Sequence, residues 1–254
     1  MSLKRLFLTL SCLILAPWLL DRSTAQAELI TNGGFEAGLA GWTVTDQAGG
    51  SGSWFAAVGT TTPFSSHATV GPASGTMLAV SDQFGPGTHA IEQSFLVPAG
   101  SNVILTFDMF VNDWSGVGPI VDPAGLDYTA FPNQHARVDI LAAGSLPFDT
   151  TGGVLANLFL GVDPGSPPNA YTSYSFDITS IVGGGGTFVV RFAEVDNQGF
   201  LNQGVDNVSI NATPASGAQP VPEPSSLALC AVLGVAGVAK RIKRRRQLPR
   251  TVSE

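Results

Sequence analysis

The chain has 254 residues, and 44% of them are hydrophobic. Its formal net charge is −7 at pH 7, but ten of its twelve basic residues lie in the two terminal segments. Between Glu28 and Gln219, two arginines stand against sixteen acidic residues, which gives this part a charge of about −14. A surface of this sign repels nucleic acid and anionic lipid, so nucleic-acid binding is excluded. It suits calcium binding or an exposed exterior domain.

The N-terminal segment, residues 1–27, has the three parts of a secretory signal peptide. Lys4 and Arg5 form the positive region, residues 6–20 are apolar almost throughout, and Ala25-Gln26-Ala27 is a small-x-small cleavage pattern. The apolar run is shorter than the roughly 20 residues that a membrane span needs. We therefore expect cleavage after Ala27, with an uncleaved N-terminal anchor as the alternative.

Residues 28–212 have the length of one domain and contain no cysteine. Both cysteines, Cys12 and Cys230, lie in the apolar terminal segments. The exported domain therefore has no disulfide, no thiolate nucleophile and no cysteine-based metal site.

Short β-rich runs between glycines and prolines predict a domain made of β-strands. In Thr187–Glu194 the alternation predicts that Phe192 faces the core and Arg191 the rim, and the apolar run Val103–Phe110 predicts burial on both faces. The pattern as a whole predicts an all-β jelly-roll β-sandwich. The strands are expected at Trp42–Asp46, Met77–Ser81, Ala90–Val97, Asn102–Val111, Ala136–Leu141, Tyr171–Asp177, Thr187–Glu194 and Val205–Asn211.

The C-terminal segment has three parts in a fixed order. A Pro/Ser/Gly linker, residues 213–225, contains Pro222-Glu223-Pro224, whose prolines keep the backbone extended. A short transmembrane helix and an Arg-rich end are predicted over residues 226–246, followed by a cytoplasmic tail, 247–254. The basic residues hold this end on the cytoplasmic side and stop transfer through the membrane. They are Lys240, Arg241, Lys243, Arg244, Arg245 and Arg246.

These three parts closely resemble the PEP-CTERM sorting signal of Gram-negative bacteria. The resemblance implies recognition by an exosortase, a membrane cysteine protease-transpeptidase, after transient anchoring in the inner membrane. It also implies removal of the tail and transfer of the protein toward the outer surface or extracellular matrix. An ordinary tail anchor is the alternative. The resemblance covers about thirty residues, so it indicates where the protein goes and little of what it does.

The two ends of the middle domain resemble galactose-binding-like jelly-roll carbohydrate-binding modules. The resemblance rests on Leu29–Glu36 with Gly41-Trp42 at the start and on Gly204–Ile210 at the end. In those modules the first and last strands lie together and often share a structural calcium ion. The resemblance therefore implies calcium at Glu36 and Asp206, with Asn32 as a further oxygen ligand. The alternative is that Asn32 caps a turn and both acids are solvated.

Three aromatic residues are the candidates for stacking on sugar rings. Trp54 follows the Gly/Ser-rich stretch 49–53, where we expect an exposed loop, and Trp114 and Tyr128 lie in or beside the long loop 113–134. Trp42 is expected in the core. Exposed aromatic rings beside Asp and Asn are typical of a sugar-binding surface, although the same pattern also occurs in ordinary loop packing.

We expect a protein that is not an enzyme. The three histidines are dispersed, and neither an H-E-x-x-H motif nor a G-x-S-x-G elbow is present. The leading hypothesis is an exported envelope or matrix protein whose domain binds extracellular polysaccharide. The alternatives are a structural matrix protein without a specific ligand and a secreted hydrolase whose active site the sequence does not reveal.

Overall fold

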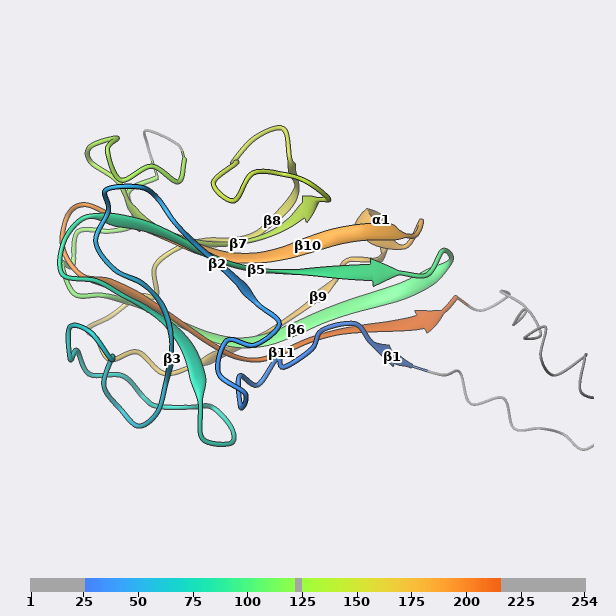
Figure 1. Ribbon diagram of the computed structural model, residues 1–254, viewed down its shortest axis with the longest axis horizontal. Coiled ribbons are helices and arrows are strands. Elements are labelled where there is room, and N and C mark those ends of the chain that lie inside the picture. Colours follow the sequence, from blue (N-terminus) through green and yellow to red (C-terminus); the bar gives the residue numbers. More distant parts are fainter. Residues whose placement is uncertain (1–25, 122–124, 216–254) are drawn as a thin grey trace, which may run out of the picture. The chain divides into compact units, whose positions relative to one another are not determined.

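The computed structural model describes residues 26–121 and 125–215, and nearly all of its regular structure is β-strand (Figure 1). One short helix, α1 (Thr179–Val182), occurs among the described residues. The strands are β1 (Ala27–Glu28), β2 (Thr43–Asp46), β3 (Ser53–Ala57), β4 (Leu78–Asp82), β5 (Gly87–Val97), β6 (Ser101–Asp113), β7 (Gln134–Ala142), β8 (Val154–Gly161), β9 (Thr172–Asp177), β10 (Gly186–Asp196) and β11 (Leu201–Pro214).

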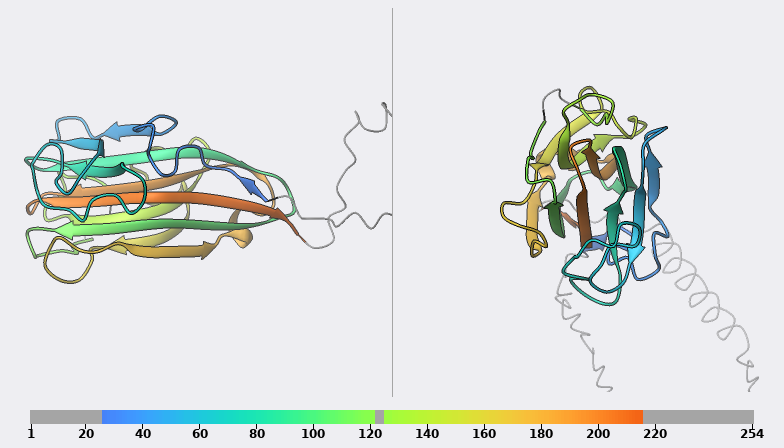
Figure 2. Two further views of the ribbon diagram at one scale, coloured as in Figure 1. Left: turned by 90° about the horizontal axis from the view of Figure 1, so that it is seen from below. Right: turned by 90° about the vertical axis from the view of Figure 1, so that its left-hand side faces the viewer.

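The strands form two antiparallel sheets that pack face to face (Figure 2). The first sheet has the order β3-β4-β11-β6-β9, with β1 added beside β11, and the second has the order β2-β5-β10-β7-β8. From β4 to β7 successive strands alternate between the two sheets, and β9, β10 and β11 alternate again. This winding confirms the predicted jelly-roll β-sandwich.

The space between the sheets is filled by alternate residues of each strand, as the period of two requires. Phe107 and Met109 from the first sheet meet Val190 and Phe192 from the second. The rings of Phe107 and Phe192 contact edge to face, with centroids 5.1 Å apart. Trp42 is also buried in this core, as predicted, and its ring lies 5.2 Å from that of Phe35.

All eight predicted strands are present, and two predictions about their faces are wrong. Arg191 does not face the rim, because the loop between β7 and β8 covers it and its side chain is buried. Within Val103–Phe110 the outer face is partly open, since Ile104 is 37% exposed. Three strands lie outside the predicted set: β1, β3 and β8.

Both ends of the described domain lie at one end of the sandwich. Ala27 pairs with Ala212, and Glu28 pairs with Asn211. The Glu28 carboxylate accepts hydrogen bonds from the backbone N–H groups of Ile30 and Ile210, each 2.9 Å long. The β4–β5 and β10–β11 turns lie at the opposite end, on the left of Figure 1. We call that end the loop end.

Most of the sequence that carries the export and sorting signals lies outside the described residues: residues 1–25 of the predicted signal peptide, the Pro222-Glu223-Pro224 motif, the apolar stretch and the basic cluster. The last residue of the predicted signal peptide, Ala27, is described and belongs to β1. Within the described ranges, no helix has the length and apolar character to cross a membrane.

Candidate functional site

Six aromatic rings form a continuous row at the loop end, which we call the aromatic row. Neighbouring ring centroids are 6.1 Å apart for Phe55–Phe64, 4.6 Å for Phe64–Phe84 and 6.4 Å for Phe84–Phe200. The row continues through His67, 4.3 Å from Phe200, to Trp114, 4.8 Å from His67. Phe64 and Phe84 are 44% and 59% exposed, so the row presents apolar ring surface to solvent.

A pocket of about 150 Å³ opens between two turns beside this row. The β4–β5 turn contributes Phe84, Gly85 and Pro86, and the β10–β11 turn contributes Asn197, Gly199 and Phe200. Asp196, the last residue of β10, also lines the pocket. Asn197 fixes the second turn, because its side-chain amide donates hydrogen bonds to the backbone oxygens of Tyr128 and Ala130.

Asp196 lies beneath the pocket and is only 2% exposed. Its carboxylate accepts hydrogen bonds from the Gly87 N–H at 2.9 Å and from the Gln83 side-chain amide at 2.7 Å. Burial raises the pKa of Asp196 to about 7, although these two hydrogen bonds oppose the shift. The pocket therefore contains a carboxyl group that titrates near neutral pH. Such perturbed pKa values are typical of functional sites.

A second acid, Glu194, is buried two residues before Asp196 on the same face of β10. Burial, reinforced by the negative charge of Asp196, raises its pKa well above the ordinary range, against an opposing effect of the nearby Ser81 hydroxyl. His89 lies 4.0 Å from Glu194 and contacts Asp46 at 2.7 Å and the Ser51 carbonyl at 2.8 Å. These contacts fix the orientation of the His89 ring between β2 and the Ser51 backbone.

A serine, a histidine and an aspartate also meet at this end, but not in the order of a proton relay. The Ser65 hydroxyl lies between Asp82 and the Nδ1 atom of His67, which is 2.7 Å away. The backbone N–H groups of Phe64 and Ser65 also donate to Asp82, at 2.6 and 2.7 Å. In a hydrolase triad the histidine stands between the other two groups. Here the contacts fasten the β3–β4 loop, which carries Phe64 and His67, to the end of β4.

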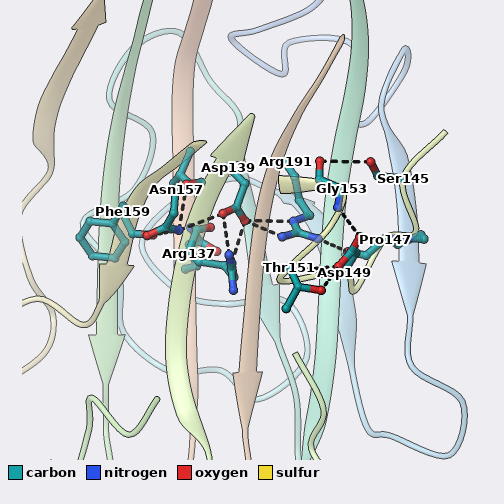
Figure 3. Close-up of polar contacts among 12 residues, drawn as sticks. Arg137, Asp139, Ser145, Pro147, Asp149, Thr151, Gly153, Asn157, Phe159 and Arg191 are labelled. Atoms are coloured by element: carbon teal, nitrogen blue, oxygen red, sulfur yellow. Dashed lines mark hydrogen bonds and ion pairs between the residues drawn. The ribbon is translucent and has the colours of Figure 1, made fainter. Parts of the chain in front are cut away.

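The two arginines of the domain lie away from the pocket, on the outer face of the second sheet. Figure 3 shows both guanidinium groups turned toward Asp139. Arg137 binds it through two hydrogen bonds of 2.7 Å, Arg191 through bonds of 2.6 and 3.1 Å, and Asn157 through one of 2.9 Å. Burial alone would raise the pKa of Asp139, but the hydrogen bonds and charges of the arginines outweigh it and hold the pKa below its usual value.

The residues predicted to bind calcium meet on one loop. Glu36 accepts hydrogen bonds from Thr76 N–H (2.8 Å), the Thr76 hydroxyl (2.7 Å) and Met77 N–H (3.0 Å), which lower its pKa. Asp206 accepts hydrogen bonds from the N–H groups of Ala73 and Ser74, at 2.9 and 3.0 Å. The described residues contain no group of three His, Cys, Asp or Glu side chains placed to hold a metal ion. Calcium binding here remains a prediction.

Asn32, the third predicted ligand, is used within its own turn. Its amide group donates to the carbonyls of Gly38 and Ala40, both at 2.9 Å, and its side-chain oxygen accepts from Ala37 N–H at 3.1 Å. The adjacent Gly33 lies against β11, where a Cβ atom would stand 1.8 Å from the Val208 carbonyl oxygen. The N-terminal motif therefore locks the first turn onto the last strand.

The three aromatic candidates from the sequence lie in different places. Trp54 is not in an exposed loop: it belongs to β3, is only 3% exposed and packs in the core, so its ring is not free to stack on a sugar. Tyr128 packs with Ala90, Ala193 and Val195 against the outer face of the second sheet. Trp114 is half-buried in the aromatic row, and its indole N–H donates to Asn202 at 3.1 Å. The structure does not bring the three together.

Sequence reasoning missed the residues that form the pocket. Two signals were present: Phe84 and Phe200 are large apolar residues inside turns, in Phe84-Gly85-Pro86 and Gly199-Phe200. The second signal is the alternation of faces along β10. Glu194 and Asp196 lie on the same face of the strand as the core residues Val190 and Phe192.

Comparison with protein families finds one match, the PEP-CTERM protein-sorting motif, over residues 220–246. It confirms the sorting signal that was predicted from the C-terminal sequence. The chain is thus an exported protein with a C-terminal membrane-anchoring signal of this kind. A search of curated proteins finds no match to the chain.

Several solved structures match the domain at low sequence identity. One is TmCBM61 in complex with beta-1,4-galactotriose, with 11% identity, 72% of this chain and 97% of that chain covered, and a TM-score of 0.43. A Stig cyclase from Fischerella sp. TAU has 18% identity, coverages of 76% and 100%, and a TM-score of 0.47. The K3 cleaved adhesin domain of Lys-gingipain from Porphyromonas gingivalis w83 has 18% identity, coverages of 72% and 99%, and a TM-score of 0.43. These likenesses concern the fold alone.

Proposed function

We propose that this protein is an exosortase substrate carried to the outer surface or extracellular matrix, where its β-sandwich binds carbohydrate at the loop end. The observation that carries the binding proposal is the pocket between Phe84 and Phe200, set in a row of partly exposed aromatic rings. Sugar-binding sites combine apolar ring surface with a few fixed polar groups. Here Asp196 and the backbone of two short turns supply the polar groups.

The topology supports this function because it separates the binding end from the anchored end. Strand β11 runs the length of the sandwich, from Leu201 beside the pocket to Pro214, after which the chain continues toward the sorting motif. The N-terminal strand β1 begins its pairing near the same place, where Ala27 pairs with Ala212. The pocket therefore lies at the far end of the domain from Pro214, the last residue of β11.

The size of the pocket sets what part of a glycan it holds. A volume of about 150 Å³ is well below the roughly 300–1,000 Å³ of sites for drug-sized ligands. It fits a single sugar residue, with the aromatic row available to the neighbouring residues of a longer chain. We therefore expect recognition of one residue or one chain end, with affinity that increases with chain length.

Glycan-array binding by the purified protein tests the proposal. Phe84→Ala should weaken binding at least ten-fold, about 1.4 kcal/mol, and Trp114→Ala should weaken binding to longer chains. Leu96→Ala is the matched control, because Leu96 is 66% exposed and lies toward the opposite end of β5. Absence of binding to every glycan, together with calcium-dependent self-association, would instead identify a structural matrix protein.

A further inference from the structure

The pocket at the loop end carries charge of one sign. Among the described residues that line it, only Asp196 is ionisable, and the others are phenylalanine, proline, glycine and asparagine. Glu194 lies behind it on the same strand. The only arginines between Glu28 and Gln219 are Arg137 and Arg191, and this region has no lysine. Both arginines are paired with Asp139 on the outer face of the second sheet, so neither offsets the charge beneath the pocket.

The aromatic lining acts in the same direction as the acid. The rings of Phe84 and Phe200 both line the pocket, with centroids 6.4 Å apart and planes inclined at 77°. The face of an aromatic ring is electronegative and attracts a cation by about 0.5–2 kcal/mol. The pocket thus places two phenyl rings beside a buried carboxylate. A positively charged ligand group held against a ring face is favoured there, whereas the carboxylate repels an anionic group.

We propose that the pocket selects a sugar bearing a positively charged amine, such as a glucosamine residue of a partly deacetylated polysaccharide, and rejects uronic acids and sulfated sugars. This inference rests on the proposed carbohydrate binding. The hydroxylated ring lies against Phe84 and Phe200, and Asp196 is the counter-charge of the ammonium group. An N-acetylated sugar lacks the positive charge and therefore binds more weakly.

The proposed pairing couples binding to a proton. Because burial holds the pKa of Asp196 at about 7, an ammonium ligand stabilises its ionised form, lowers its pKa and displaces a proton. Two groups donate hydrogen bonds to the Asp196 carboxylate: the side-chain amide of Gln83, in the β4–β5 turn, and the N–H of Gly87, the first residue of β5. Glu194 interacts electrostatically with Asp196 and also with Asp46 and Asp82. His89 lies 4.0 Å from Glu194 and contacts Asp46. Affinity should therefore decrease as pH falls through about 7, and decrease again as pH rises above the pKa of the sugar amine, which then becomes neutral.

Isothermal titration of the full chain in mild detergent tests this inference, with oligomers of glucosamine, N-acetylglucosamine and galacturonate as probes. At neutral pH the glucosamine oligomer should bind about ten-fold more tightly than its N-acetylated counterpart, the range that one cation–π contact and one screened ion pair supply. The galacturonate oligomer should not bind. Cadaverine, an amine without a sugar ring, should also fail to bind.

Three variants separate charge from fold. Asp196→Asn should reduce the preference for the amine to about two-fold and remove the acid limb of the pH profile. Phe84→Leu, at an exposed position, keeps apolar volume but removes one aromatic face, and it should lower the preference even if Asp196→Asn fails to fold. Asp177→Asn, an exposed acid at the opposite end of the domain, should leave the preference and the profile unchanged.

The outcomes distinguish this inference from the proposed function. Equal or tighter binding of the N-acetylated or galacturonate oligomer overturns the amine selectivity and leaves carbohydrate binding in place. If cadaverine binds as tightly as the glucosamine oligomer, the pocket recognises an ammonium group without the sugar ring, and the inference is also overturned. Failure of every glycan to bind overturns both proposals.

Discussion

Removing the carboxylate of Asp139 should be among the most destabilising single changes on the outer face of the second sheet. In Asp139→Ala, four hydrogen bonds from Arg137 and Arg191 and one from Asn157 lose their acceptor. Two guanidinium groups, both largely shielded from solvent, then have no counter-charge from this strand. Loss of one partner from a buried ion pair costs about 3–5 kcal/mol of unfolding free energy.

For a domain of this size, each kcal/mol corresponds to roughly 2–4 °C, so the melting temperature should fall by roughly 6–20 °C. Differential scanning calorimetry of parent and variant measures this, with Asp177→Asn as a control expected within about 0.5 kcal/mol of the parent. Since the pKa of Asp139 is depressed, its contribution is complete above the unfolded pKa of about 3.9 and is lost as pH falls through the folded pKa. A loss below about 1 kcal/mol would show that the arginine pairs do not hold this face together.

Three further predictions concern the calcium site and the two terminal segments. Calcium joining Glu36 and Asp206 should stabilise the domain by about 2.7 kcal/mol at 100 times its dissociation constant; a melting temperature unmoved by chelator would leave these acids only their hydrogen bonds to the 73–77 loop. N-terminal sequencing of the exported protein should begin at Glu28, and a sequence beginning at Met1 would contradict cleavage. Replacing Pro222, Glu223 and Pro224 with alanines should preserve export but trap the full-length protein in the inner membrane, as cell fractionation would show. If the variant is instead processed and distributed like the parent, the motif is only a spacer.

Strand β10 shows how far the sequence predicts the fold. Its alternation predicts the inward position of Phe192, because branched and aromatic residues at every second position mark a half-buried strand. The same alternation continues to Glu194 and Asp196, which are buried between the sheets. Acidic residues are expected in solvent unless a tertiary partner is known. Their neighbours Ser81 and His89 come from other strands, and Gln83 comes from the β4–β5 turn. The local sequence pattern of β10 therefore does not predict this part of the site.

Strands β3 and β8 were missed for different physical reasons. In β3, Trp54 and Phe55 directly follow the Gly/Ser-rich stretch 49–53. Glycine and serine are typical of turns, so the sequence predicts a loop here and not a strand. Strand β8 lies at the edge of its sheet, and its pairing with β7 shifts register twice. Its burial pattern therefore lacks the regular period on which a sequence prediction depends.

The aromatic row could not be predicted because its members come from five segments. Phe55 belongs to β3, Phe64 and His67 to the β3–β4 loop, Phe84 to the β4–β5 turn, Trp114 to the loop after β6 and Phe200 to the β10–β11 turn. Only the winding of the strands brings these segments to one end. The sorting signal, in contrast, is a contiguous motif and was predicted from sequence alone.

Residue-level mapping of glycan binding tests the central claim most directly. In backbone amide NMR spectra of the isotopically labelled mature protein, a glycan identified on the array should shift the resonances of residues 83–87 and 196–200, and those of Trp114 and its neighbours with longer chains. Residues 106–108 and 173–175, which line a second hollow of about 280 Å³ on the first sheet, should not shift. Shifts confined to that hollow or to the end near Pro214, with the loop end unaffected, would contradict the assignment of the binding site.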